Sequence, residues 1–333
     1  MTLRNLPLHR HATGLLASLL ILAGCSVAPI HEKPNIATPA AFKEAAPVDA
    51  HWKPAEPADS AARGDWWHVF GDPLLDRLER DAVVANPDLM AAAARLGQAR
   101  ALEQSARAAR APQVGVGFGP TRQRPSPAAQ GLAADADTQA RTLWRGQATI
   151  AYEVDLFGRL ASAEEAARLD SAQREALFAV TLLSLQADVA QAYFLIRELD
   201  AAQALYADTV RLRADTAKLL QRRFDEGDIA ELDLARARSE LASARSESLG
   251  LARQRAVAEH ALAILLGKQP AEFSLPPMPL GRLSIEVPAG LPSALLERRP
   301  DIAAAERAMA AANARIGVAR AAWFPRLSLT GAL

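Results

Sequence analysis

Residues 112–121, PQVGVGFGPT, and residues 144–156, WRGQATIAYEVDL, decide the fold of this chain. In the first stretch Val114, Val116 and Phe118 alternate with glycine and glutamine, and the second stretch alternates in the same way. A period of two places apolar side chains on one face of a strand and polar side chains on the other. A strand that crosses a bilayer needs about ten residues of this kind. A soluble amphipathic hairpin would show the same pattern, so both interpretations stand at this point.

The polar face of the second stretch supplies the candidate lumen-facing residues of a membrane hairpin: Gln147, Thr149, Glu153 and Asp155. The alternating glycines of the first stretch resemble a phosphate-binding loop. Pro120, however, stands where the GxGxxG spacing needs its third glycine, and no helix follows at once. Small residues facing a crowded or open interior explain these glycines better.

Long helical segments flank the hairpin. From Leu160 to Phe224 the chain has no proline or glycine, and apolar residues recur at the three-four spacing of a coiled-coil seam. Such a helix is roughly 100 Å long. A return helix is expected over 229–266, and a helix over 86–111 is expected before the hairpin. The lengths of these two helices together match the long helix, so we expect them to stack end to end along it.

The turn between the long helix and the return helix concentrates charge around a glycine. We expect this turn to dock a periplasmic partner, because it lies at the end of the helix remote from the hairpin. A solvated turn whose charge serves solubility alone is the alternative. The residues concerned are Arg222, Arg223, Phe224, Asp225, Glu226, Gly227 and Asp228.

The amino terminus has the form of a secretory signal. Residues 14–26, GLLASLLILAGCS, follow Arg4 and Arg10, and their apolar run is too short to span a bilayer but suits a signal-peptide core. Residues 22–25 resemble a bacterial lipobox, which predicts a lipid on the thiol of Cys25. Ser26 favours the outer membrane over retention in the inner one. A plain signal peptide with an incidental cysteine is the alternative.

Composition excludes several classes of function. Lys+Arg and Asp+Glu both number 38 and aromatic residues make up 5%, so the chain lacks the basic excess of a nucleic-acid-binding protein. The six histidines show no metal-ligand or catalytic-triad spacing. We therefore expect no enzyme, no cofactor and no metal. Carboxylates are plentiful, and on helices of this length we interpret them as a solvated face.

The chain repeats itself. When it is shifted by 213 residues, Pro87 meets Pro300, Asp88 meets Asp301 and Pro112 meets Pro325, which indicates an internal duplication. The strand that begins at Leu327 is then the counterpart of the one at Val114. We expect the chain to end within its second repeat, and this last strand to lack a partner.

Three stretches carry a resemblance to a known family: WWHVFGDPLLDRL, YEVDLFGRL and above all GLPSALLERRPDIAAAERAMAAANARIGVARAAWFPRLSLTG. They closely resemble the outer-membrane factor family, the TolC-like outer-membrane lipoproteins of RND efflux systems, of the OprM and NodT type. The resemblance extends from the lipobox to the end of the chain. Members have two full repeats, whereas here the second lacks a strand and its long helices.

The resemblance implies a mainly α fold with transmembrane β-hairpins: a long α-helical barrel and a trimeric twelve-stranded β-barrel, of which this chain holds the first repeat and the start of the second. It implies a homotrimer that acts as the passive channel of a tripartite efflux pump, with a periplasmic adaptor and an inner-membrane transporter as partners. A lipid-anchored coiled-coil scaffold or adaptor without a pore is the rival interpretation, but it would have no use for strands of membrane length.

The expected domain division follows from these features. It comprises a signal peptide (1–24), an extended tether (25–65), equatorial and first periplasmic helices (66–111), a transmembrane β-hairpin (112–157), a long periplasmic helical hairpin (158–268), a Pro-rich connector (269–295) and the start of the second repeat (296–333).

Overall fold

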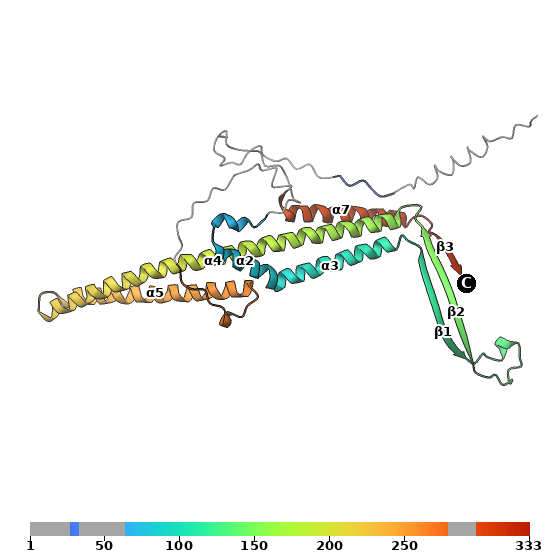
Figure 1. Ribbon diagram of the computed structural model, residues 1–333, viewed down its shortest axis with the longest axis horizontal. Coiled ribbons are helices and arrows are strands. Elements are labelled where there is room, and N and C mark those ends of the chain that lie inside the picture. Colours follow the sequence, from blue (N-terminus) through green and yellow to red (C-terminus); the bar gives the residue numbers. More distant parts are fainter. Residues whose placement is uncertain (1–26, 33–63, 279–297) are drawn as a thin grey trace, which may run out of the picture. The chain divides into compact units, whose positions relative to one another are not determined.

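The computed structural model describes residues 27–32, 64–278 and 298–333, which belong to two compact units (Figure 1). The first unit contains 97–174 and 304–333 together with the amino-terminal residues, and the second contains 64–96, 175–278 and 298–303 among its described parts. Helices α3 (Pro87–Ala108) and α4 (Arg159–Asp225) contribute residues to both units. The expected signal peptide, Cys25 and most of the tether lie outside the described residues.

In the second unit, helix α2 (Pro73–Ala85) begins where its sequence predicts. The Asp72 carboxylate caps the helix by accepting hydrogen bonds from the backbone N–H groups of Leu74 (2.9 Å) and Leu75 (3.3 Å). Pro73 takes the first helical position, where no N–H is needed. The short 3₁₀ helix η1 (Trp66–Phe70) precedes this cap.

The apolar core of the second unit gathers around α2, the middle of α4 and the end of helix α5 (Glu231–Leu265). The apolar stripes of α4 and α5 face this core, which explains why apolar residues recur there at helical spacing. The largest fully buried apolar side chains are Tyr193, Leu75, Ile196, Leu262, Leu266 and Val189.

Asn86 joins two helices end to end. Its Oδ1 accepts a hydrogen bond of 3.0 Å from the backbone N–H of Leu89 and so caps α3, while its Nδ2 donates a bond of 3.0 Å to the carbonyl of Leu265 in α5. Beside this contact, Gly267 adopts φ +63° against the backbone of Ala85, a position that leaves no room for a Cβ. The expected end-to-end stacking of α3 and α5 is confirmed at this joint.

Helices α4 and α5 form an antiparallel hairpin (Figure 1). Arg213 contacts Glu240 at 2.5 Å, and Arg238 donates a hydrogen bond to Gln221 across the pair. α4 ends at Asp225 and Gly227 makes the turn with φ +81°, a left-handed conformation that favours glycine. The return helix begins at Glu231, two residues later than expected.

The sheet of the first unit has three antiparallel strands in the order β1 (Gln113–Gln123), β2 (Arg141–Val154), β3 (Leu327–Ala332). The expectation that the last strand lacks a partner was wrong. β3 pairs with β2 from Val154↔Leu327 to Thr149↔Ala332, so one of its two edges is hydrogen-bonded. The cause is geometric. β1 occupies only one edge of β2, so the other edge of β2 is open and accepts β3.

The duplication is visible in the structure. Helix α7 (Pro300–Ala321) repeats α3 at both ends with the same shift of 213 residues, and β3 follows α7 as β1 follows α3. The ring of Phe157, after β2, stacks on that of Phe324, before β3, with centroids 4.3 Å apart. One stacked aromatic pair therefore joins the end of β2 to the start of β3 at the junction between helices and strands.

Residues 27–32 lie on α7 and the start of α4. Asn313 donates a hydrogen bond of 2.9 Å to the carbonyl of Pro29. Gly317 makes this approach possible, because a Cβ at that position would lie 2.7 Å from both the Cβ of Ala28 and the Oγ of Ser162. At the aligned positions α3 has Arg100 and Gln104, so the two copies of the helix are not equivalent as seats for this segment.

Candidate functional site

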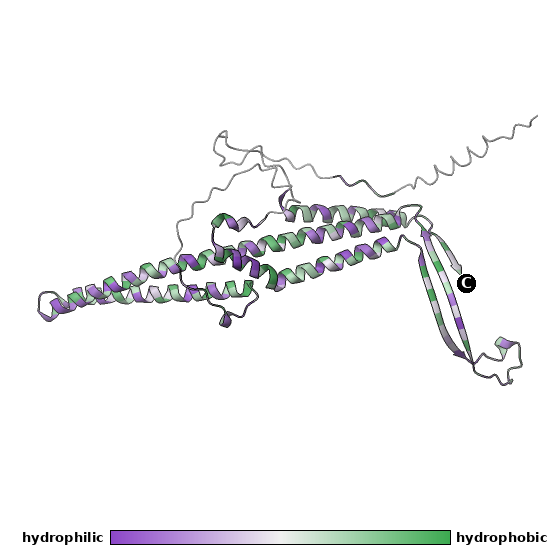
Figure 2. Ribbon diagram, viewed as in Figure 1, coloured by the Kyte–Doolittle hydropathy of each residue, from purple (hydrophilic) through white to green (hydrophobic). Residues whose placement is uncertain are grey.

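The sheet has two chemically different faces. Residues that pair directly across antiparallel strands point to the same side, so the register assigns every residue to a face. Figure 2 shows the resulting bands of hydrophobic and hydrophilic residues along β1 and β2. One face carries Val114, Val116, Phe118, Trp144, Ile150, Tyr152, Leu327 and Leu329, with Arg122 and Thr142 next to the loop. The other face carries Gln113, Gln123, Arg141, Arg145, Gln147, Thr149, Glu153, Ser328 and Thr330, together with Leu143.

The apolar face is exposed. Val116 is 84% exposed, Phe118 78% and Trp144 65%, which is a contiguous apolar surface of the kind that marks a membrane or protein contact. The rings of Phe118 and Trp144 stack with centroids 5.5 Å apart. β1 and β2 have 11 and 14 residues, long enough to cross a bilayer.

The polar face rests on a floor of glycines. Gly115, Gly117 and Gly119 of β1 lie opposite Thr149, Gln147 and Arg145 of β2, in that order. The Thr149 hydroxyl lies over Gly115, so that a Cβ there would come within 2.8 Å of its oxygen. The side chains that stand above this floor therefore come from β2.

Two of the four sequence-predicted lumen residues, Gln147 and Thr149, lie on the polar face over the glycine floor. Glu153 is also on that face, but the guanidinium of Arg159 holds its carboxylate with three hydrogen bonds of 2.8–3.0 Å. Asp155 lies beyond the end of β2 at Val154, and its carboxylate accepts a hydrogen bond of 2.8 Å from the backbone N–H of Ala161. Its assignment to the strand was wrong, because the start of α4 uses it as a cap.

Sequence reasoning missed two residues of the polar face. Arg145 lies opposite Gly119, and Arg141 lies opposite Gln123. Both side chains are exposed. The alternation that selected Gln147 and Thr149 continues to Arg145, so the signal was present in the period of two.

The charged turn after α4 is exposed at Arg222, Arg223 and residues 225–228, and half-buried at Phe224. The backbone N–H of Asp228 donates to the carbonyl of Arg223 at 2.8 Å, and their side chains approach within 4.0 Å. The turn is thus ordered by its own backbone and presents its charges to solvent.

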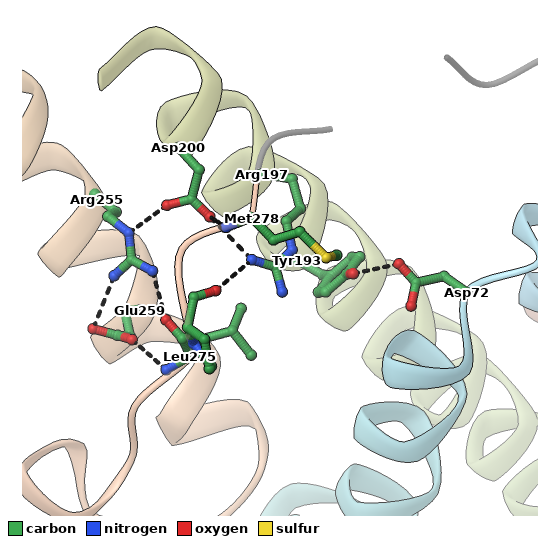
Figure 3. Close-up of polar contacts among 9 residues, drawn as sticks. Asp72, Tyr193, Arg197, Asp200, Arg255, Glu259, Leu275 and Met278 are labelled. Atoms are coloured by element: carbon green, nitrogen blue, oxygen red, sulfur yellow. Dashed lines mark hydrogen bonds and ion pairs between the residues drawn. The ribbon is translucent and has the colours of Figure 1, made fainter. Parts of the chain in front are cut away.

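A buried polar network links α4, α5 and the segment after α5 (Figure 3). The Asp200 carboxylate accepts hydrogen bonds from Arg255 Nε (2.6 Å), Arg197 Nη1 (3.0 Å) and the backbone N–H of Met278 (2.9 Å). Burial raises the pKa of the Asp200 carboxyl, but these three donors outweigh it and hold the pKa below its usual value.

The same network holds the chain after α5 by its backbone. Arg255 donates to the carbonyl of Leu275 at 2.6 Å, Glu259 accepts from the N–H of Leu275 at 2.6 Å, and Arg197 donates to the carbonyl of Pro276 at 2.8 Å. Figure 3 also shows the hydroxyl of Tyr193, next to Arg197, donating to Asp72, the cap of α2. These contacts position the start of the connector and of α2 on the same turns of α4.

Within the described residues, no group of three or more His, Cys, Asp or Glu side chains could hold a metal ion. Among those residues α4 is also the one helix with an 18-residue window apolar enough to cross a membrane, and a third of that window is buried. The buried part of α4 packs in the apolar core with α2 and α5.

Comparison with known proteins decides the family. The family model described as "Outer membrane efflux protein" matches residues 78–268 and 291–333. The chain belongs to this outer membrane efflux protein family. The match covers the helical hairpin, the sheet and the start of the second repeat.

Relatives and solved structures agree with the family. The chain is 36% identical over 326 residues to the "Probable efflux pump outer membrane protein TtgC" of Pseudomonas putida, covering 95% of this chain and 64% of TtgC. It is 35% identical to the outer membrane protein OprJ of Pseudomonas aeruginosa, covering 94% and 64%. The outer-membrane channel OprN matches with a TM-score of 0.75 at 33% identity, over 92% of this chain and 66% of OprN. The MtrE channel of Neisseria gonorrhoeae, in its open state, gives 0.74 at 30% over the same shares.

These findings confirm the resemblance to TolC-like outer-membrane factors, their fold class and the expected place in the outer membrane. The family is one of transport conduits. The chain spans about 64% of the length of TtgC and OprJ.

Proposed function

We propose that this protein is the outer-membrane channel component of a tripartite efflux pump and acts as a passive conduit, without enzymatic activity. The observation that carries the proposal is the two-faced sheet. Its apolar face suits lipid, and its polar face presents the polar side chains of β2 over glycines of β1.

Closure of the sheet requires further strands. β1 and β3 are the edges of the described sheet, and a sheet edge cannot face lipid because its backbone groups would be unpaired. A homotrimer that shares one twelve-stranded barrel would supply neighbouring strands by symmetry, with four strands from each chain, of which the described sheet has three. Relatives are named as antibiotic, toluene and solvent efflux proteins, which makes small organic compounds the cargo that we propose.

Reconstitution tests this proposal. For a full-length version we expect trimers that dissociate on heating before electrophoresis, and ionic conductance when the purified protein is added to a planar bilayer. A stable, water-soluble monomer without conductance would favour the alternative of a lipid-anchored coiled-coil scaffold or adaptor.

We propose the turn 222–228 as the docking site of the periplasmic adaptor, which in turn engages the inner-membrane transporter. The support is the exposure of its charges on an ordered turn. A photo-crosslinker at Asp228 should capture the adaptor in cells with an active pump, and the same group at Glu247, an exposed site on α5, should not. Equal capture at both sites would favour a merely solvated turn.

We propose the domain division expected from the sequence, in which the signal peptide comprises residues 1–24 and Cys25 carries the lipid. Replacement Cys25→Ala should abolish labelling with radioactive palmitate, because Cys25 is the sole cysteine. The barrel should still keep the protein in the outer membrane. Persistent labelling would contradict the lipobox interpretation.

A further inference from the structure

We infer that Arg145 gives the strand region of the channel a preference for anions. The inference rests on the proposed function, since it assumes that the polar face of the sheet lines water. It names a residue that sets the selectivity of the conduit.

Arg145 lies on the polar face, five residues into β2, directly opposite Gly119. A Cβ built on Gly119 would meet nothing within 4 Å, so no neighbouring wall crowds this place. The side chain of Arg145 is exposed and makes no hydrogen bond or ion pair with any described residue. Its charge is therefore available to interact with ions in the water that the polar face is proposed to line.

The described strands leave an excess of positive charge on the polar face. The acid that the described strands place on this face is Glu153, and Arg159 binds both of its oxygens. Gln147 and Thr149 are neutral. The uncompensated charges of the face are then Arg145 and Arg141, and both are positive.

Arg145 differs from Arg141 in its surroundings. Arg141 begins β2 and adjoins the loop 124–140, which contains Asp135 and Asp137. Asp137 is paired with Arg124 at 2.6 Å, so this end of the hairpin has charges of both signs. Arg145 is the next residue after Gln147 on the same face toward the loop, and Gly119 opposite it is not covered by any side chain. A ring of three such residues in a trimer is the arrangement by which pores favour anions.

Thiol labelling gives the first test and does not depend on conductance. In Gln147→Cys, an anionic thiol reagent should react faster than a cationic reagent of similar size, with the parent chain as the background control. Adding Arg145→Gln should lower the anionic-to-cationic rate ratio by about threefold, since a unit charge one step away in water at 0.1 M salt has an effect of this size. Adding Arg122→Gln, an exposed arginine on the opposite face, should leave the ratio unchanged.

The outcomes separate the two proposals. If Gln147→Cys reacts with neither reagent in the membrane-inserted protein, the polar face is not in water, and the proposed channel falls together with the inference. If it reacts but Arg145→Gln leaves the ratio unchanged, the channel stands and the inference is wrong.

Reversal potentials give the second test. In a KCl gradient across a planar bilayer, the reversal potential of the parent protein should lie between zero and the equilibrium potential of chloride. Arg145→Gln should shift the reversal potential toward zero, and Arg145→Glu should shift it further, toward the equilibrium potential of potassium. Identical reversal potentials in all three proteins would overturn the assignment.

Discussion

Asp200 and Arg255, 55 residues apart in the chain, are joined by a hydrogen bond of 2.6 Å from the guanidinium Nε to the carboxylate. Arg197 shares the same carboxylate and is 1% exposed. Replacement Asp200→Ala would leave the buried Arg197 without its counter-ion and Arg255 with Glu259 alone, so we expect a loss of about 3–5 kcal/mol in the free energy of unfolding. Asp200→Asn retains one acceptor and should lose less.

A matched pair on the same helix provides the control. Asp208 and Arg211 are also three residues apart and 3.0 Å from each other, but their side chains are 68% and 67% exposed. Asp208→Ala should cost about 0.5 kcal/mol or less, because exposed ion pairs contribute little. Thermal unfolding in detergent compares the variants, and equal losses at the two sites would show that the network has no special role.

Asn86 should hold the joint between α3 and α5. Asn86→Ser keeps a cap for α3 but cannot reach the carbonyl of Leu265, whereas Asn86→Ala loses both contacts. We expect losses of about 1 kcal/mol for serine and about 2 kcal/mol for alanine. Unfolding in denaturant measures them. A serine variant as stable as the parent would mean that the bond to Leu265 contributes nothing.

Glu79 should make stability depend on pH. Its side chain is fully buried, neither carboxylate oxygen has a hydrogen-bond partner, and burial raises its pKa to about 8. Because the folded state then holds the proton more tightly than the unfolded state, the stability that it contributes is complete below about pH 4.5 and is lost as the pH rises to about 8.

The variant Glu79→Gln cannot ionise, so the melting temperature should fall less between pH 5 and pH 8 than it does in the parent. The exposed Glu247→Gln is the control and should retain the slope of the parent. Parallel pH profiles for Glu79→Gln and the parent would contradict this account of Glu79.

Gly317 should be required for seating residues 27–32. The side chain in Gly317→Gln, which copies the aligned residue of α3, has no room between Ala28 and Ser162. Cysteines that replace Ala28 and Ser162 should form a disulfide when residue 317 is glycine, and should fail to form it in Gly317→Gln. Gly97→Ala is the control, because a Cβ at Gly97 meets nothing within 4 Å. A disulfide that survives Gly317→Gln would show that the seat lies elsewhere.

Local patterns predicted the elements well. The absence of proline and glycine from Leu160 to Phe224 predicted α4 within a residue at each end, and Asp72-Pro73 predicted the start of α2. The duplication predicted α7 and β3. These features depend on residues near one another in the chain, so sequence suffices for them.

Features that depend on distant pairing were missed. The partner of β3 is set by the free edge of β2, and no local pattern records it. The carboxylates of α4 were interpreted as a solvated face, which holds for Asp208 but not for Asp200. Both have an arginine three residues away, and the difference arises from Arg255 and the backbone of Met278, which only the fold brings to Asp200.

The central claim is that β2 separates lipid from a water-filled interior. A nitroxide spin label placed in turn at each position from Leu143 to Val154 in membrane-inserted protein tests it most directly. We predict that accessibility to oxygen, which concentrates in lipid, peaks at Trp144, Ala148 and Ile150, and that accessibility to a water-soluble nickel complex peaks at the positions between them. Equal accessibility to the nickel complex on both faces would contradict the claim and identify the sheet as a soluble hairpin.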